Sequence, residues 1–217
     1  MEVYPVINAV DEAEAVSLLA RARRLVPPGG WLHIDVADGR FTPHRTFNRL
    51  AFWEKIARVY RLEVHLMVEE PEEAVEMWLR AGAARVIIHY EALPERNRGV
   101  AINNILDSGR RHKTEVFIST NPETHLHRLR PTLARFDGYQ VLAVHPGLSE
   151  QKFQWRVLEK ITFLRRYFPD ATIEVDGGID SEAACSVKAA GATRVVSASY
   201  LWKQVHPEKA YAELLAV

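Results

Sequence analysis

Residues 71–89, with the sequence PEEAVEMWLRAGAARVIIH, contain one helix followed by one strand. Apolar residues recur with helical spacing over Pro71–Ala81, and Arg85–His89 is a short run rich in β-branched residues that is typical of a buried strand. Gly82 lies between the two, where glycine commonly ends a helix. The pattern AGAARV returns as AGATRV in Ala190–Val195, which indicates that the chain repeats this unit.

The same alternation of strand and helix runs along the whole chain. Eight runs are predicted strands: Val3–Ile7, Trp31–Val36, Leu62–Val68, Arg85–His89, Glu115–Thr120, Tyr139–Val144, Thr172–Val175 and Arg194–Ala198. The clearest predicted helices are Glu12–Leu25, Phe47–Tyr60, Pro71–Ala81, Arg98–His112, Glu150–Phe168 and Ser181–Ala190. Eight repeats in 217 residues, without a linker, predict an α/β fold with one domain over residues 1–217, a (β/α)₈ TIM barrel. A doubly wound sheet is the main alternative.

Charge and composition restrict the class of partner. The formal charge is +0, because 28 Lys and Arg balance 28 Asp and Glu. Nucleic acids and anionic membranes normally need a basic surplus, so we expect neither as a partner. No apolar stretch approaches the roughly 20 residues of a membrane span, and the N-terminus has no secretory signal pattern. Cys185 is the single cysteine, which excludes an intrachain disulfide, and we expect a cytoplasmic protein.

Side chains that commonly bind metals lie near the ends of several predicted strands. His33 and Asp35 alternate along one strand and therefore face the same side. His65 lies in the next strand, and Asp176 ends the seventh with the parity of Glu174. Active sites of such barrels lie at the C-terminal ends of the strands. Two imidazoles and two carboxylates there predict a divalent metal site for Zn²⁺, Mn²⁺ or Fe²⁺. Without a cation, the close carboxylates repel and one takes up a proton.

Each of these residues also has an ordinary structural interpretation. A single strand histidine often forms structural hydrogen bonds, and an aspartate after a strand often caps a helix or forms a turn. All four together, at predicted C-terminal strand ends, favour the metal site. His89 ends the fourth predicted strand, but its neighbours Tyr90 and Glu91 match no pattern. We interpret His89 as a residue that lines the mouth or serves the structure.

Five short motifs follow one another along most of the chain. They are His33–Pro43 (HIDVADGRFTP), Val64–Val68 (VHLMV), Pro146-Gly147, Gln151–Phe153 (QKF) and Glu174–Ile179 (EVDGGI). In this order they resemble the ribulose-phosphate 3-epimerase family. The combination is specific, because a His-x-Asp-x-x-Asp-Gly element followed by the two later strand motifs is rarely obtained by chance.

The resemblance implies a metal-dependent isomerase that inverts C3 of a ketose phosphate, converting D-ribulose 5-phosphate to D-xylulose 5-phosphate. A divalent metal, held by the two histidines and two aspartates named above, would bind the ketose oxygens and stabilise the enediolate formed when the C3 proton leaves. Asp35 and Asp176 would lie on opposite faces of the substrate, one removing a proton and the other delivering one. The resemblance also implies a homo-oligomer.

The predicted substrate contacts depart from the family pattern. A serine that family members carry in the first strand matches Ala9 here. Of three methionines that usually line the enediolate, only Met67 remains, with Ala37 and Leu142 at the other two positions. The phosphate end of the site differs as well. The usual Asn-Pro-Gly-Phe-Gly-Gly-Gln loop reads HPGLSEQ over residues 145–151, and the usual Gly-Ser after the last strand is Ala-Ser.

These loop changes weaken the expected phosphate site. Ser149 and Glu150 replace glycines whose amides normally approach the phosphate, and Glu150 adds a negative charge. Gly177 and Gly178 are retained, either for phosphate binding or for a tight turn alone. Compensating groups are expected among Arg40, Lys152 and His145. The predicted substrate and phosphate contacts are Met67, Gly147, Gly177, Gly178, Ala198 and Ser199.

Two other functions remain open from the sequence. The same chemistry on a related ketose or ketose 6-phosphate would accommodate the altered loops. A metal-binding homologue without turnover is the alternative from a different class, although retention of Asp35 and Asp176 argues against it. Decarboxylases of the same superfamily use an Asp-x-Lys-x-x-Asp element, and residues 33–38 contain no lysine, so this function ranks last.

Overall fold

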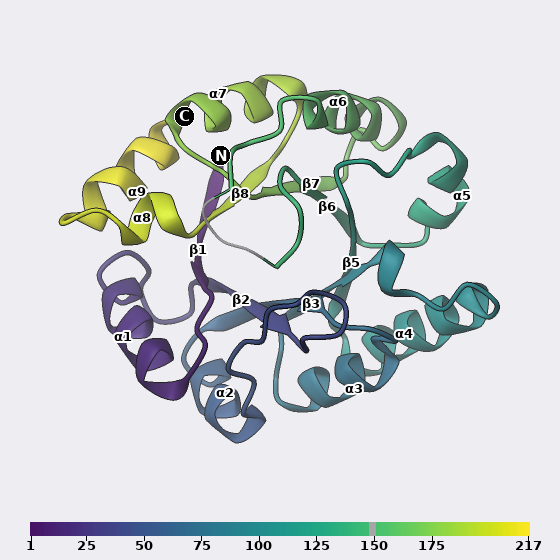
Figure 1. Cartoon of the computed structure of the whole chain (residues 1–217), viewed down its shortest axis with the longest axis horizontal. Coiled ribbons are helices and arrows are strands. Elements are labelled where there is room, and N and C mark those ends of the chain that lie inside the picture. The colour runs from purple at the N-terminus through teal and green to yellow at the C-terminus, as the bar shows by residue number, and fades with distance from the viewer. Residues whose placement is uncertain (148–150) are drawn as a thin grey trace.

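The structure, a computed structural model, describes residues 1–147 and 151–217 and contains a closed barrel of parallel strands (Figure 1). Each strand pairs with the next along the chain, and β1 pairs with β8, where Val3 faces Val195. This closure confirms the TIM barrel and excludes the doubly wound sheet. The strands are β1 (Glu2–Ile7), β2 (Trp31–Ala37), β3 (Arg61–Met67), β4 (Arg85–His89), β5 (Glu115–Thr120), β6 (Gly138–Leu142), β7 (Thr172–Asp176) and β8 (Arg194–Ser197).

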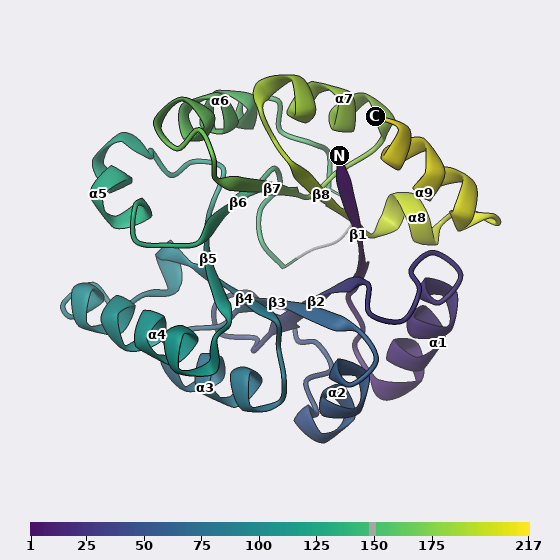
Figure 2. The same cartoon turned by 180° about the vertical axis from the view of Figure 1, so that it is seen from behind.

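Helices form a ring around the barrel, as both views along its axis show (Figures 1 and 2). Helix α9 covers the closing strand, since the Tyr211 hydroxyl donates to the Val3 carbonyl oxygen at 3.1 Å. The helices are α1 (Glu12–Ala22), α2 (Leu50–Ala57), α3 (Glu72–Arg80), α4 (Arg98–His112), α5 (Arg130–Leu133), α6 (Val157–Tyr167), α7 (Ser181–Ala190), α8 (Ser199–Trp202) and α9 (Pro207–Ala216). Short 3₁₀ helices occur at Tyr90–Ala92 and His127–Leu129.

Capping residues explain where several helices begin and end. Asp11 accepts a hydrogen bond from the Glu14 amide at 2.8 Å and starts α1, and Asp180 does the same for the Ala183 amide at the start of α7. Such caps satisfy amides that have no partner within the helix. Gly191 ends α7 with φ 113°, a conformation that favours glycine. Helices α4 and α7 have the predicted bounds.

Four of the predicted helices are shorter in the structure. Helix α1 ends at Ala22 rather than Leu25, and α3 spans Glu72–Arg80 rather than Pro71–Ala81. The other two are shortened by more residues. The predicted helix over residues 47–60 is limited to α2, because the Phe47 amide donates to the Ala9 carbonyl oxygen at 2.7 Å and ties that residue to the barrel. The predicted helix over residues 150–168 begins only at Val157. The Gln154 amide donates to the Ala143 carbonyl oxygen at 2.8 Å, which ties the segment before α6 to the end of β6.

Strand residues of opposite parity enter two different environments. The outward set, such as Leu62, Val64 and Leu66 of β3, is fully buried in the main core between barrel and helices. The inward set of the same strand is Glu63 and His65, followed by Met67 at the mouth. A separate small apolar cluster of Tyr4, Val6 and Val196 occupies part of the interior. The interior of this barrel is therefore largely polar, and it contains the candidate site.

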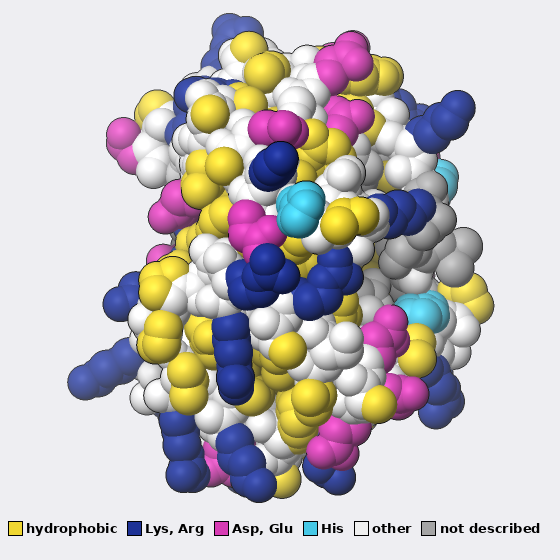
Figure 3. All heavy atoms as spheres, turned by 90° about the vertical axis from the view of Figure 1, so that its left-hand side faces the viewer, with side chains coloured by type: hydrophobic (Ala, Val, Ile, Leu, Met, Phe, Trp, Pro, Cys, Tyr) yellow, Lys and Arg dark blue, Asp and Glu magenta, His cyan; other side chains and the backbone are white. Residues whose placement is uncertain are grey.

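The outer surface mixes charges of both signs. Figure 3 shows the side that faces left in Figure 1, around α1, α8 and α9, where Lys and Arg side chains lie among Asp and Glu. Arg24, which follows the end of α1, pairs with Glu208 of α9 at 2.5 Å, as expected for solvated surface charges. In the described part of the chain, none of the helices combines the length and hydropathy required to cross a bilayer.

Gly138 provides a test of the packing inside the barrel. A Cβ atom there would lie 2.3 Å from Cζ of Phe117, whose ring is fully buried. We expect Gly138→Ala to lower the free energy of unfolding by about 1–3 kcal/mol, because the ring must shift within a close-packed interior. Chemical denaturation measures this change.

Gly99→Ala is the matched control for that substitution. Gly99 is exposed in α4, and a Cβ there would have no neighbour within 4 Å. We expect this variant to be as stable as the unmodified protein or up to about 1 kcal/mol more stable, because alanine favours helix. An equal loss of stability in both variants would show that steric pressure from Phe117 is not the cause.

Candidate active site

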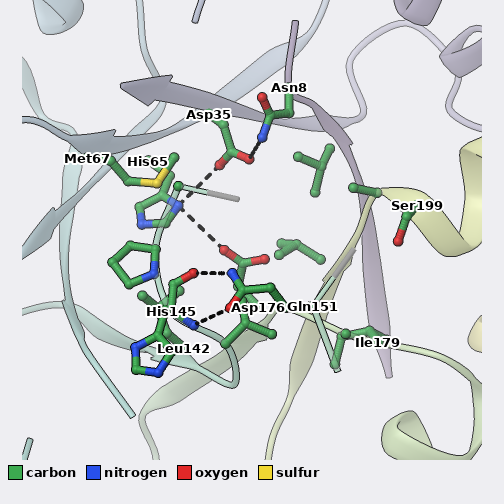
Figure 4. A pocket seen from close by; sticks show the side chains of 18 residues that line it. Asn8, Asp35, His65, Met67, Leu142, His145, Gln151, Asp176, Ile179 and Ser199 are labelled. Atoms are coloured by element: carbon green, nitrogen blue, oxygen red, sulfur yellow. Dashed lines mark hydrogen bonds and ion pairs between the residues drawn. The ribbon is translucent and has the colours of Figure 1, made fainter. Parts of the chain in front are cut away.

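The four predicted metal ligands meet at the C-terminal end of the barrel. His33 and Asp35 come from β2, His65 from β3 and Asp176 from the end of β7. One potential ligand atom from each lies within 4.8 Å of all the others. Figure 4 shows Asp35 and Asp176 on either side of His65, whose Nδ1 lies 3.2 Å from Asp35 Oδ1 and 3.5 Å from Asp176 Oδ2.

His33 is the deepest member of this cluster. Its side chain is fully buried, and its Nδ1 lies 2.7 Å from Glu63 Oε1. Its Nε2 is 3.3 Å from Asp35 Oδ1 but has no well-directed hydrogen bond. A buried ring nitrogen without a hydrogen-bond partner, close to three other ligand atoms, is what a metal ion would satisfy. The donor set of two imidazoles and two carboxylates therefore fits a divalent cation of the zinc, manganese or iron type.

His89 lies next to His65, outside the four potential ligands, although its sequence neighbours match no motif. Its Nε2 lies 2.7 Å from Nε2 of His65, and the two rings stack with their centroids 4.9 Å apart. Burial lowers the pKa of His89 to about 4, so the neutral ring can accept the proton of His65 Nε2. Alternation along β4 could have identified His89 from the sequence, because it places His89 on the same inward face as Arg85 and Ile87.

The two aspartates have different ionisation behaviour. Burial raises the pKa of Asp176 to about 6, and the negative charge of Asp35 adds to the effect. Burial also opposes ionisation of Asp35, but the neighbouring imidazoles of His33 and His65 outweigh this effect and hold the pKa of Asp35 below its usual range. The raised pKa of Asp176 has the direction expected for one of two close carboxyl groups in the absence of a cation.

A pocket opens above the cluster, with a volume of about 630 Å³ including the part open to solvent. The predicted substrate and phosphate contacts all line it: Met67, Gly147, Gly177, Gly178, Ala198 and Ser199. Asp35, His65 and Asp176 form its floor, whereas His33 lies beneath the surface (Figure 4).

Ala9, the position matched to the family serine, does not face the pocket. Ala9 is buried in the core on the helix side of the barrel and is not among the pocket residues. Val6 and Asn8 line the pocket instead, because the inward parity of β1 continues through them. The Asn8 amide nitrogen donates to Asp35 Oδ2 at 3.0 Å and so positions that carboxylate. Alternation along the chain from Val6 could have predicted from the sequence that Asn8 also lines the pocket.

The glycines at the far end of the pocket have a packing role of their own. Gly177 and Gly178 have φ of 102° and 66°. A Cβ on Gly177 would lie 2.4 Å from Val144, and one on Gly178 would lie 2.7 Å from the Phe153 backbone nitrogen. These contacts bring the loop after β7 against the loop after β6 and leave the backbone of both exposed to the pocket.

Basic side chains are scarce at this end of the pocket. Of the compensating groups named from sequence, His145 lines the pocket, whereas exposed Arg40 pairs with Glu69 at 2.7 Å elsewhere. Lys152 is exposed and is not among the lining residues. Ser149 and Glu150 lie outside the described residues. Within the described ranges, the lining contains no lysine or arginine.

Comparison with known proteins agrees with the motifs. The model of the ribulose-phosphate 3 epimerase family matches residues 5–202. The chain is 36% identical to ribulose-phosphate 3-epimerase of Chlamydia muridarum over 201 residues, which cover 88% of this chain and 85% of that protein. It is 34% identical to ribulose-phosphate 3-epimerase of Bacillus subtilis over 190 residues, covering 84% of each chain.

Solved structures with low sequence identity show the same fold. One is 3-keto-L-gulonate-6-phosphate decarboxylase of Vibrio cholerae, with a TM-score of 0.73 and 11% identity over 99% of this chain and 95% of that chain. Such likeness concerns the barrel alone, whereas the family match covers the sequence. The chain belongs to the ribulose-phosphate 3-epimerase family, whose named relatives are carbohydrate epimerases of the isomerase class.

Proposed function

We propose that this protein interconverts D-ribulose 5-phosphate and D-xylulose 5-phosphate with a divalent metal as cofactor. The name of its relatives supports the substrate and the position of epimerisation. The observation that carries the proposal is the cluster of His33, Asp35, His65 and Asp176 at the floor of the pocket. When bound there, a divalent metal supplies Lewis-acid stabilisation of the negative charge that develops when the C3 proton leaves.

Asp35 and Asp176 would be the two groups that move protons. They approach the cluster from β2 and β7, on either side of His65 (Figure 4). One carboxylate takes the C3 proton, and the carboxyl group on the other side delivers a proton to the opposite face of C3, so the configuration inverts. Their opposite pKa displacements support one base and one acid near neutral pH.

Backbone amides would bind the phosphate. Gly177, Gly178, Ala198 and Ser199 line the end of the pocket where barrels of this type commonly bind phosphate. Gly147 lines the facing loop. The absence of lysine and arginine from the described lining residues favours amide donors over side-chain cations for this role.

The first test concerns the two aspartates. Asp35→Asn and Asp176→Asn are each expected to slow epimerisation by about 10²–10⁴-fold, because each removes one proton-transfer group. The measurement is formation of D-xylulose 5-phosphate together with deuterium uptake at C3 in deuterium oxide, followed by NMR.

Asp107→Asn is the control, because Asp107 pairs with Arg110 on the exposed face of α4. It should retain the turnover of the unmodified protein. Full activity in either active-site variant would contradict the two-aspartate assignment. Metal binding by the unmodified protein without turnover of this substrate would direct the search to related ketose phosphates, and failure with all of them would indicate a homologue without turnover.

The second test is metal removal. Treatment with a chelator is expected to abolish turnover, and Zn²⁺, Mn²⁺ or Fe²⁺ should restore it at one ion per chain. Replacement of His65 by Gln should raise the metal dissociation constant, because one of the four ligands is lost. Turnover that persists in metal-free protein, checked by elemental analysis, would contradict the cofactor assignment.

The third test is the pH dependence of metal affinity. Below about pH 6 the raised pKa of Asp176 keeps this carboxyl group protonated in the metal-free protein. It must lose that proton to bind a cation, so affinity should fall by an additional factor of about ten per pH unit below this point. Competition with a chromophoric chelator between pH 5 and 7.5 measures the slope. Asp176→Asn has no carboxyl proton to release at this position, so its metal affinity should lack the additional pH dependence. An unchanged slope in this variant would show that the released proton comes from another group.

A further inference from the structure

A buried carboxylate lies directly behind His33. Glu63 Oε1 is 2.7 Å from His33 Nδ1, and both side chains are completely buried. A carboxylate can only accept, so the shared proton lies on His33 Nδ1. The opposite ring nitrogen, Nε2, is the atom without a hydrogen-bond partner at the metal cluster. This hydrogen bond therefore determines which nitrogen of His33 faces the cluster.

Glu63 is itself held in place from below. Its second oxygen, Oε2, accepts from Arg85 Nη1 at 2.6 Å and lies 3.3 Å from Arg194 Nη1. Both arginines continue to carboxylates at the opposite end of the barrel: Arg85 Nε donates to Glu115 at 2.9 Å, and Arg194 Nη2 donates to Glu2 at 2.7 Å. One carboxylate oxygen of Glu63 thus accepts from His33, and the other accepts from the two arginines.

This charged layer is a costly way to fill a barrel. Apolar branched side chains usually occupy the interior of such barrels. Desolvation of charges often cancels the gain from their pairing, so well-packed apolar residues would serve stability equally well. A role in orienting the site above accounts for charged residues in this layer.

We infer that Glu63 is a positioning residue for the metal site: it orients His33 through Nδ1 and leaves Nε2 available to the cation. This inference rests on the proposed metal-dependent function. Carboxylates that accept from a ligand histidine commonly increase metal affinity, because they set the tautomer and orientation of the ring.

Two other interpretations of the contact between Glu63 and His33 are a second metal site and an equivalent role for Glu174. The contacts favour neither. His33, Glu63 and Glu174 are close enough together to hold a cation, but Arg85 and Arg194 already place positive charge against these carboxylates. Glu174 Oε1 lies 3.9 Å from His33 Nδ1, beyond hydrogen-bond distance, and accepts from Gln140 at 3.2 Å. Glu174 therefore shares the layer and its burial but forms no hydrogen bond with His33 among the described contacts.

The experiment compares Glu63→Gln with Glu174→Gln. The metal-free proteins are titrated with Zn²⁺ against a chromophoric chelator, and with Co²⁺, whose visible absorption reports ligand geometry. We expect Glu63→Gln to weaken Zn²⁺ binding by about 10–100-fold and to change the Co²⁺ spectrum. Glu174→Gln should bind both ions with nearly the affinity and spectrum of the unmodified protein. Thermal unfolding of each metal-free variant separates loss of affinity from loss of fold.

Unchanged Zn²⁺ affinity in Glu63→Gln, or an equal loss in both variants, would overturn the inference. If Glu63→Gln fails to fold, ¹⁵N NMR of the histidine rings in the zinc-loaded unmodified protein provides the test. We expect His33 to be protonated at Nδ1 with Nε2 bound to the metal, and a proton on Nε2 would overturn the inference. Failure of the unmodified protein to bind any of these ions would instead contradict the proposed function.

Discussion

Compensation of negative charge inside the barrel is the constraint on which this structure depends. Four carboxylates, Asp35, Glu63, Glu174 and Asp176, lie in one buried space. Despite burial, His33 and His65 hold the pKa of Asp35 low, and His33 and Arg85 hold the pKa of Glu63 low, whereas burial raises the pKa values of Glu174 and Asp176. The interior thus has more acids than positive partners for them. A divalent cation at the mouth would remove that imbalance, and this is the physical basis for the proposed cofactor.

The compensation is arranged as a sequence of contacts along the barrel axis. Exposed Glu2 and Glu115 hold the two arginines at one end, and the arginines hold Glu63 in the middle. Glu63 contacts His33, which reaches the mouth, where His65 is held in turn by His89. Each ligand imidazole is therefore oriented through the ring nitrogen that faces away from the cluster. Such an arrangement reduces the freedom of the ligands before any ion or substrate binds.

The end of the pocket that is proposed to bind phosphate is shaped by close packing of two loops rather than by paired charges. Gly177 and Gly178 allow two loops to approach until no Cβ would fit between them, and their amides remain at the pocket surface. Asn8 and the carboxylates occupy the opposite end. The proposed binding of an anion at one end and a cation at the other would suit a ketose phosphate, whose charge lies at one end and whose reacting hydroxyl and carbonyl oxygens lie at the other.

The sequence by itself determined the barrel, and it predicted the four side chains that meet at the mouth and the six residues that line the pocket, because alternation along a strand and strand-end position are local properties. Ala9, the position matched to the family serine, lies in the core, and Val6 and Asn8 line the pocket instead. Only the tertiary structure revealed that His89 contacts His65 and that Glu63 contacts His33, pairs 24 and 30 residues apart. Contacts between strands depend on the stagger with which the barrel closes, and no single segment of the chain contains that information.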